Sequence, residues 1–239
     1  MAIPGVGRCP VYEFKPLVSF GNDLLLPAPL YGIRVPPGLG GQVPAPEFVG
    51  PARMVSMLLA ARGGPGGGLG VVHGLTKAEF SLRFSNPGQQ WKQVRNGSGP
   101  PFWQFQGGDV FLEVEITVYV LGGDRPHPGD RISNRIFAII VEHELLHVLD
   151  EIDLVSQWMP AQARQDEKVK KYLTNAEPVD DSMFRFWFQG RGLENWLRDG
   201  LWAPEHNARA AVRDSPGEYG RLQRAIDALR IQAINRPSR

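Results

Sequence analysis

The spacing of hydrophobic positions along the chain changes from a period of two to the period of an α-helix near residue 130. In residues 109–121, "DVFLEVEITVYVL", an apolar side chain occupies every second position from Val110 to Val120, and most positions between them are polar. This alternation predicts a β-strand with one buried face. Shorter alternating segments at 79–85 and 102–106 predict two further strands.

A long helix is predicted directly after these strands. Residues 131–155, "RISNRIFAIIVEHELLHVLDEIDLV", contain neither proline nor glycine, and their apolar side chains recur at helical spacing, which is typical of a largely buried helix. An earlier helix is predicted at 51–62, because proline stands in its first turn and the glycine-rich segment 63–70 ends it; we interpret that segment as a linker. Three later helices are predicted, at 162–173, 203–214 and 216–234.

The order of these elements predicts an α+β fold, because strands precede the long helix and helices follow it. Residues 1–50 hold nine of the 21 prolines and eight glycines, so we expect them to form an extension that packs on the core or flanks it. The remaining residues, 51–239, are predicted to form one domain. Its first part, 51–155, contains the sheet and the long helix, and its second part, 156–239, is a mainly helical subdomain.

Composition excludes several classes of protein. A chain of 239 residues with 42% hydrophobic residues is long enough to bury a proper core. The net charge of +1, with acidic and basic residues mixed, argues against nucleic acid or a membrane surface as a partner. No signal peptide and no apolar run of membrane-spanning length is present. We therefore expect a cytoplasmic protein, or one exported by a route independent of a signal peptide.

The candidate chemistry lies inside the long helix, in "VEHELLHVL". His143 and His147 are four positions apart, so they share one helix face, which is the geometry that two imidazoles need to bind one metal ion. Cys9 is the only cysteine, so a metal site must use histidine and carboxylate ligands. Polar side chains among Ile, Val and Leu cost desolvation unless they are satisfied, which favours a metal site over two histidines that merely bond to nearby carbonyls.

These residues resemble the H-E-x-x-H signature of the zincin metallopeptidases, and the flanking Val141, Val148 and Leu149 agree with the longer pattern of that group. The resemblance implies an α+β zincin-like fold, a Zn²⁺ ion and hydrolysis of a protein or peptide substrate. In such enzymes zinc lowers the pKa of a water toward about 7. Glu144 is then expected to be the catalytic general base.

The third zinc ligand must come from another part of the chain. In the gluzincins it is a glutamate of an E-x-x-A sequence on a later helix, and Glu205 with Ala208 is similar to that pattern. The resemblance therefore implies Glu205 as the ligand. Two alternatives stay open: Asp153, at the spacing of the metzincins, and Glu218. We interpret Asp150 or Glu151, one turn beyond the second histidine, as an outer hydrogen-bond acceptor or a solvated charge.

The expected function is that of a zinc-dependent endopeptidase. The strand at 109–121 is a candidate edge strand to which an extended peptide adds, although an ordinary interior strand gives the same pattern. Two other functions remain open: a catalytically silent, metal-stabilised binding module, and a delivered toxin or phage-associated metallopeptidase with a narrow substrate. An intact Glu144 argues against the silent module, because a structural metal site needs no general base.

Overall fold

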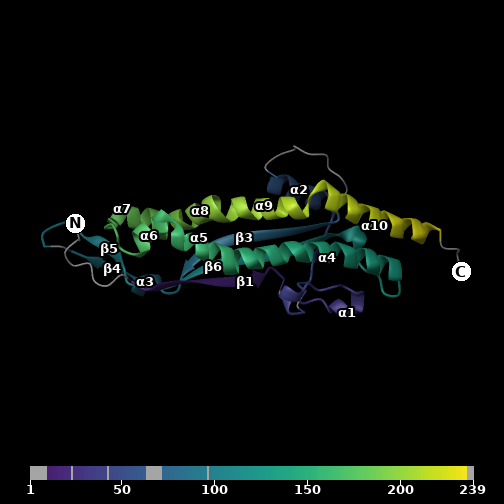
Figure 1. Ribbon diagram of the computed structural model, residues 1–239, viewed down its shortest axis with the longest axis horizontal. Helices are drawn as coiled ribbons and strands as arrows, with labels where there is room; N and C mark the ends of the chain where they lie inside the picture. The colour runs from purple at the N-terminus through teal and green to yellow at the C-terminus, as the bar shows by residue number, and fades with distance from the viewer. Residues whose placement is uncertain (1–9, 23, 42, 63–71, 96, 236–239) are drawn as a thin grey trace. The chain divides into compact units, whose positions relative to one another are not determined.

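The computed structural model describes residues 10–22, 24–41, 43–62, 72–95 and 97–235, and its fold is mixed α and β (Figure 1). The strands are β1 (Tyr12–Phe20), β2 (Glu47–Val49), β3 (Gly74–Phe84), β4 (Trp91–Val94), β5 (Phe102–Phe105) and β6 (Gly108–Leu121). The helices are α1 (Ala28–Tyr31), α2 (Pro51–Arg62), α3 (Pro87–Gln90), α4 (Arg131–Asp153), α5 (Met159–Gln165), α6 (Glu167–Leu173), α7 (Asp181–Phe184), α8 (Gly192–Leu197), α9 (Ala203–Arg213) and α10 (Pro216–Ile234). As predicted, the described strands all precede the long helix α4, and helices follow it.

The helix α2 ends at the predicted residue, and the glycine-rich linker predicted at 63–70 lies outside the described residues. Instead of one helix at 162–173, the structure has α5 and α6, because the side chain of Asp166 caps a new helix by accepting from the N–H groups of Lys168 and Val169. None of the described helices combines the length and the apolar character needed to cross a membrane.

The chain divides into two compact units, each built from three segments. The first contains residues 1–19, 79–114 and 152–207, and the second contains residues 20–78, 115–151 and 208–239. The predicted division at residue 155 differs from this one. The first unit includes the two-stranded sheet of β4 and β5 and a cluster of aromatic rings. In this cluster the rings of Phe184 and Phe188 both contact Trp91, whereas Phe186 is exposed.

Strand β6 is the centre of the main sheet. It pairs with β1, β2 and β3. Its pairing with β2 is parallel, with Glu47 opposite Tyr119. Hydrogen bonds from Leu121 N–H to the His73 carbonyl and from Ser85 N–H to the Asp109 carbonyl mark an antiparallel pairing with β3 along the whole of β6. Because β3 covers one side of β6, β1 and β2 lie on the other.

This topology decides between the two alternatives for residues 109–121. The strand has neighbours on both sides, so it is an interior strand and not a free edge. The predicted alternation is confirmed, because the six apolar side chains of one face are at most 1% exposed: Val110, Leu112, Val114, Ile116, Val118 and Val120. Within the described residues β3 pairs only with β6, which makes β3 an edge of the sheet. The proline-rich residues 1–50 supply two strands of this sheet, β1 and β2.

Helix α4 forms a large part of the core of the second unit. Asp130 begins it by accepting the N–H of Ile132 at 2.9 Å, as a capping aspartate does. Its buried face includes Phe137, Ile140 and Leu145, each at most 1% exposed. A π-helical turn at 154–158 follows Asp153, so the end predicted at residue 155 lies inside that turn.

A buried polar network fixes α10 within the same unit. The Nδ1 atom of His73 lies 2.7 Å from the Asp124 carboxylate, and the side chain of His73 is fully buried. Arg230 of α10 donates to the other carboxylate oxygen at 2.8 Å, and Gln223 of α10 contacts His73 Nε2 at 3.2 Å. Buried charges of this kind are retained when they are paired and hydrogen-bonded. The network therefore ties α10 to the start of β3 and the end of β6.

Replacement of a buried leucine on α4 tests this view of the core. Leu145→Ala removes a fully buried side chain, and we expect the free energy of unfolding to fall by about 2–5 kcal/mol because a cavity remains. Chemical denaturation measures the change. The matched control is Leu59→Ala on α2, where the side chain is 37% exposed, and a loss as large as that of Leu145→Ala there would contradict the assignment of the core.

Candidate metal centre

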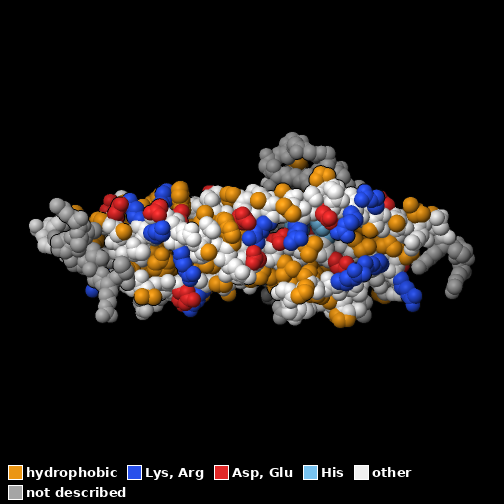
Figure 2. All heavy atoms as spheres, in the orientation of Figure 1, with side chains coloured by type: hydrophobic (Ala, Val, Ile, Leu, Met, Phe, Trp, Pro, Cys, Tyr) orange, Lys and Arg blue, Asp and Glu red, His pale blue; other side chains and the backbone are white. Residues whose placement is uncertain are grey.

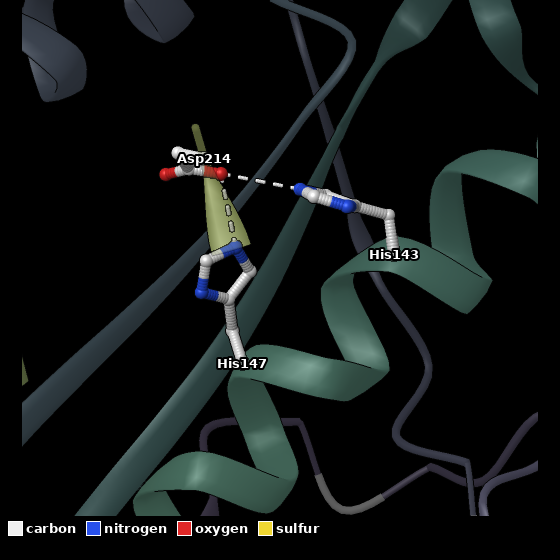
Figure 3. Close-up of side chains that lie close together, drawn as sticks. All are labelled: His143, His147 and Asp214. Carbon is white, nitrogen blue, oxygen red and sulfur yellow. Dashed lines mark hydrogen bonds and ion pairs between the residues drawn. The ribbon is translucent and has the colours of Figure 1, made fainter. Parts of the chain in front are cut away.

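Two imidazoles of α4 and one carboxylate that follows α9 meet at one point (Figure 3). The Nε2 atoms of His143 and His147 each lie 3.2 Å from Oδ1 of Asp214. The two rings project from successive turns of α4 toward the same point, with ring centroids 5.1 Å apart. The sequence prediction that the two histidines share one face is confirmed.

Asp214 reaches this point because of how α9 ends. The residue directly follows α9, and its N–H group donates to the carbonyl of Ala210 at 2.8 Å. The preceding Arg213 forms a two-pronged ion pair with Asp150 of α4, at 2.8 and 2.9 Å. Arg209 donates to the carbonyl of the same Asp150 at 3.1 Å. The end of α9 is thus fastened to α4 at Asp150, one turn beyond His147.

The three side chains fit a metal ion. Their ligand atoms all lie within 4.8 Å of one another. In a tetrahedral site with bonds of about 2.0–2.2 Å, ligand atoms are about 3.3–3.6 Å apart, close to the two distances of 3.2 Å found between the imidazoles and Asp214. Both imidazoles are largely buried, at 11% and 13% side-chain exposure, whereas Asp214 is 41% exposed. One side of the cluster therefore stays open to a further ligand.

The electrostatics of the cluster favour a negative carboxylate beside the imidazoles. Burial acts to raise the pKa of Asp214, but the hydrogen bonds and charges of the two histidines outweigh it and lower that pKa well below its usual range. Burial acts to lower the pKa of His147, and the bond to Asp214 together with the charges of Glu144 and Asp150 raises it. A cation at this position would interact favourably with the same carboxylate.

Glu144 directly follows His143 on α4 and is only 4% exposed. Burial raises the pKa of its carboxyl group, whereas the charges of His147 and His143 and a hydrogen bond from Thr76 lower it. The hydroxyl of Thr76, on β3, donates to Oε2 at 2.8 Å. A Cβ atom at Gly74 would lie 2.6 Å from Oε1, so the start of β3 approaches this carboxylate closely only because residue 74 is glycine.

The third member of the cluster, a carboxylate, is not one that the sequence analysis proposed. Among the described residues, Asp214 is the carboxylate grouped with the two imidazoles, and Glu205, Asp153 and Glu218 are not members of the group. Glu205 stands in the first turn of α9, nine residues before Asp214, or about two and a half helical turns. Asp153 is the last residue of α4, and Glu218 pairs with Arg221 at 2.7 Å.

Asp214 was missed because its local sequence has a simpler explanation. In "RDSPGE" a serine and a proline begin the next helix, and an acidic residue near a helix N-terminus is favoured by the helix dipole alone. The signal that was available is the position of Asp214 directly after α9, where the dipole of that helix disfavours a negative charge.

Comparison with known proteins identifies no relative of this chain. No protein-family model, no curated protein and no solved structure matches the chain. The centre is therefore defined by its own geometry, as a cluster of two histidines and one aspartate that can hold a metal ion.

The choice between Asp214 and Glu205 is directly testable. Asp214→Ala removes one of three ligands, and we expect it to lower the affinity for a divalent ion by more than the roughly 10–100-fold that the loss of an outer hydrogen-bond partner costs. Glu205→Ala serves as the matched control and leaves the affinity unchanged. Calorimetric titration of the metal-depleted protein with Zn²⁺ and with Co²⁺ measures both. If Glu205→Ala weakens binding and Asp214→Ala does not, the cluster is not the metal centre.

The ion pair beside the cluster gives a second prediction. Arg213→Met keeps much of the side-chain length but breaks the pair with Asp150, so the end of α9 is no longer fastened and Asp214 is less well positioned. We expect metal affinity to fall by about 10-fold or more while all three ligands remain. Arg221→Met, which breaks the Arg221–Glu218 pair on α10, is the control. Equal metal affinities in the two variants would show that the pair does not position Asp214.

Proposed function

We propose that the protein is a zinc-dependent peptidase, with His143, His147 and Asp214 as metal ligands and Glu144 as general base. The observation that carries the proposal is the position of Glu144. Its buried carboxylate is held by Thr76 within the electrostatic influence of both histidines. A site that only stabilises the fold has no use for a buried base at this position, which argues against the catalytically silent module.

The donor set supports zinc. Two imidazole nitrogens and one carboxylate oxygen, with one side open, are typical of catalytic zinc sites, whereas magnesium and calcium prefer oxygen ligands. Two histidines and one carboxylate also bind iron(II) in oxygenases. Glu144 favours the hydrolytic assignment, because hydrolysis needs a base that takes a proton from water. An α+β chain with a histidine-bearing helix under a sheet edge agrees with the resemblance to zincins.

In the proposed hydrolysis, Glu144 transfers the proton and Thr76 positions Glu144. When bound, zinc lowers the pKa of a water ligand toward about 7. Glu144 accepts the proton of the attacking water and delivers it to the nitrogen of the departing amine. Thr76 donates its hydroxyl hydrogen to Oε2 of Glu144, which holds the carboxylate in one orientation. Burial of Glu144 raises its pKa, and a raised pKa suits a group that must both take up and release a proton near neutral pH.

Strand β3 offers a place for an extended peptide. His73 and Ser85, at the two ends of β3, form main-chain hydrogen bonds with β6. The main-chain N–H and C=O groups of odd-numbered residues of β3 therefore point to β6, and those of even-numbered residues point to the free edge. Glu194 accepts the N–H group of Leu82 on that edge at 3.1 Å. Within the described part of the chain β3 pairs only with β6, so no further strand lies against this edge at Thr76 and Ala78. A peptide that added to this edge at Thr76 would lie next to Glu144.

Glu144→Gln separates chemistry from metal binding. Glutamine keeps the size of glutamate but cannot accept the proton, so we expect cleavage of an unfolded protein such as casein to fall by about 10²–10⁴-fold while zinc stays bound. Turnover and zinc content are measured on the same samples. Glu167→Gln on α6, where the side chain is 88% exposed, controls for the loss of one carboxylate. A Glu144→Gln protein that cleaves as fast as wild type would falsify the peptidase mechanism.

A further inference from the structure

A cavity of about 310 Å³ borders His143 within the second unit. Helices α4 and α10 and the residue Arg34 form its walls. Its apolar floor consists of Ile139, Leu146, Leu222 and Ala225. Ile139 and Leu146 stand one turn before and one turn after His143, so they share its helix face. The cavity therefore opens directly beside one ligand of the metal centre.

The positive and negative charges of the residues that line the cavity do not sum to zero. Glu142 accepts from Arg135 at 3.2 Å and from the main-chain N–H of Arg34 at 3.0 Å. Glu218 is paired with Arg221 at 2.7 Å. Both carboxylates of the wall thus have an arginine partner. Among the described residues, the guanidinium group of Arg34 has no carboxylate partner, and it leaves the cavity with one positive charge in excess.

The surface view agrees with this mixture of charges. Figure 2 shows a pale-blue histidine patch, with acidic and basic side chains next to it and hydrophobic side chains close by, in the region of α4 and α10. A cavity with an apolar floor and a cationic rim matches a ligand with a short apolar stem and a terminal carboxylate. Its volume is at the lower end of the range of small-molecule pockets, which suits one side chain rather than a whole peptide.

We propose that this cavity is a subsite for a substrate carboxylate, bound by Arg34 on an apolar floor of α4 and α10. The proposal rests on the proposed peptidase function, because it names the residue that the enzyme accepts beside the metal centre. A carboxylate on a short stem has two sources in peptides, the side chain of a glutamate and the C-terminus of the chain. The two sources share the same chemistry at Arg34, and the test below distinguishes them.

Binding to the Glu144→Gln protein tests the subsite without turnover. The probes are fluorescein-labelled, alanine-based hexapeptides with one variable position. Three of them are amidated at the C-terminus and carry Glu, Gln or Leu, and a fourth carries Gln and a free C-terminal carboxylate. Fluorescence anisotropy gives the dissociation constants with zinc-loaded protein. We expect the Glu peptide, or the peptide with the free C-terminus, to bind about fivefold more tightly than the amidated Gln peptide.

Two arginine variants test whether Arg34 causes the preference for a carboxylate. Arg34→Ala is expected to abolish it, whereas Arg224→Ala, an exposed arginine of α10 outside the cavity, is expected to retain it. Tighter binding of the internal Glu identifies a side-chain subsite, and tighter binding of the free acid identifies a C-terminal subsite. Equal binding of all amidated and free peptides, or a preference that survives Arg34→Ala, overturns the proposal.

The peptide-binding experiment and the cleavage assay distinguish failure of the subsite from failure of the peptidase function. If the wild-type protein cleaves no peptide but the Arg34-dependent preference is present, the subsite stands and the hydrolytic function fails. If the wild-type protein cleaves peptides with no dependence on a carboxylate, the function stands and the subsite fails.

Discussion

The shared contact of two imidazoles with one carboxylate oxygen is the interaction on which the account of this protein depends. His143 and His147 meet Oδ1 of Asp214 at 3.2 Å each. The contact joins α4, which lies in the core, to the end of α9, which the sequence places 67 residues later than His147. Two imidazoles and one carboxylate are brought to one point, where together they could hold a cation.

The surroundings of this contact hold it in place from two directions. On one side Arg213 and Asp150 fasten the end of α9 to α4. On the other side β3 approaches α4 closely at Gly74, and the hydroxyl of Thr76 fixes the carboxylate of Glu144. Metal sites generally need such outer contacts to orient their ligands. The start of β3 and the candidate metal centre therefore both contact the same stretch of α4.

The sequence predicts much of this architecture because its local signals are strong. The two-residue alternation of β6 and the uninterrupted helical spacing of α4 each belong to one element, and His143 and His147 are fixed relative to each other by that helix alone. The carboxylate that meets the two imidazoles does not follow from a local signal. Asp214 meets them through tertiary packing, and the sequence around it equally suits a helix start, so Glu205 with its E-x-x-A context was the stronger local candidate.

Local sequence also does not determine which strand forms the edge of the sheet. The pattern of residues 109–121 predicts a strand with one buried face, and both an interior strand and an edge strand have that pattern. Only the pairing of β6 with strands on both sides makes it interior and gives the edge to β3. The choice is set by non-local hydrogen bonds, which leave no mark in the spacing of side chains along one strand.

The most direct test of the central claim is a crystal structure of the zinc-loaded protein with anomalous diffraction recorded at the zinc absorption edge. The account predicts one anomalous peak about 2.0–2.2 Å from Nε2 of His143, Nε2 of His147 and a carboxylate oxygen of Asp214. A peak coordinated by Glu205 or Glu218 in place of Asp214, or no peak at the two histidines, would contradict it.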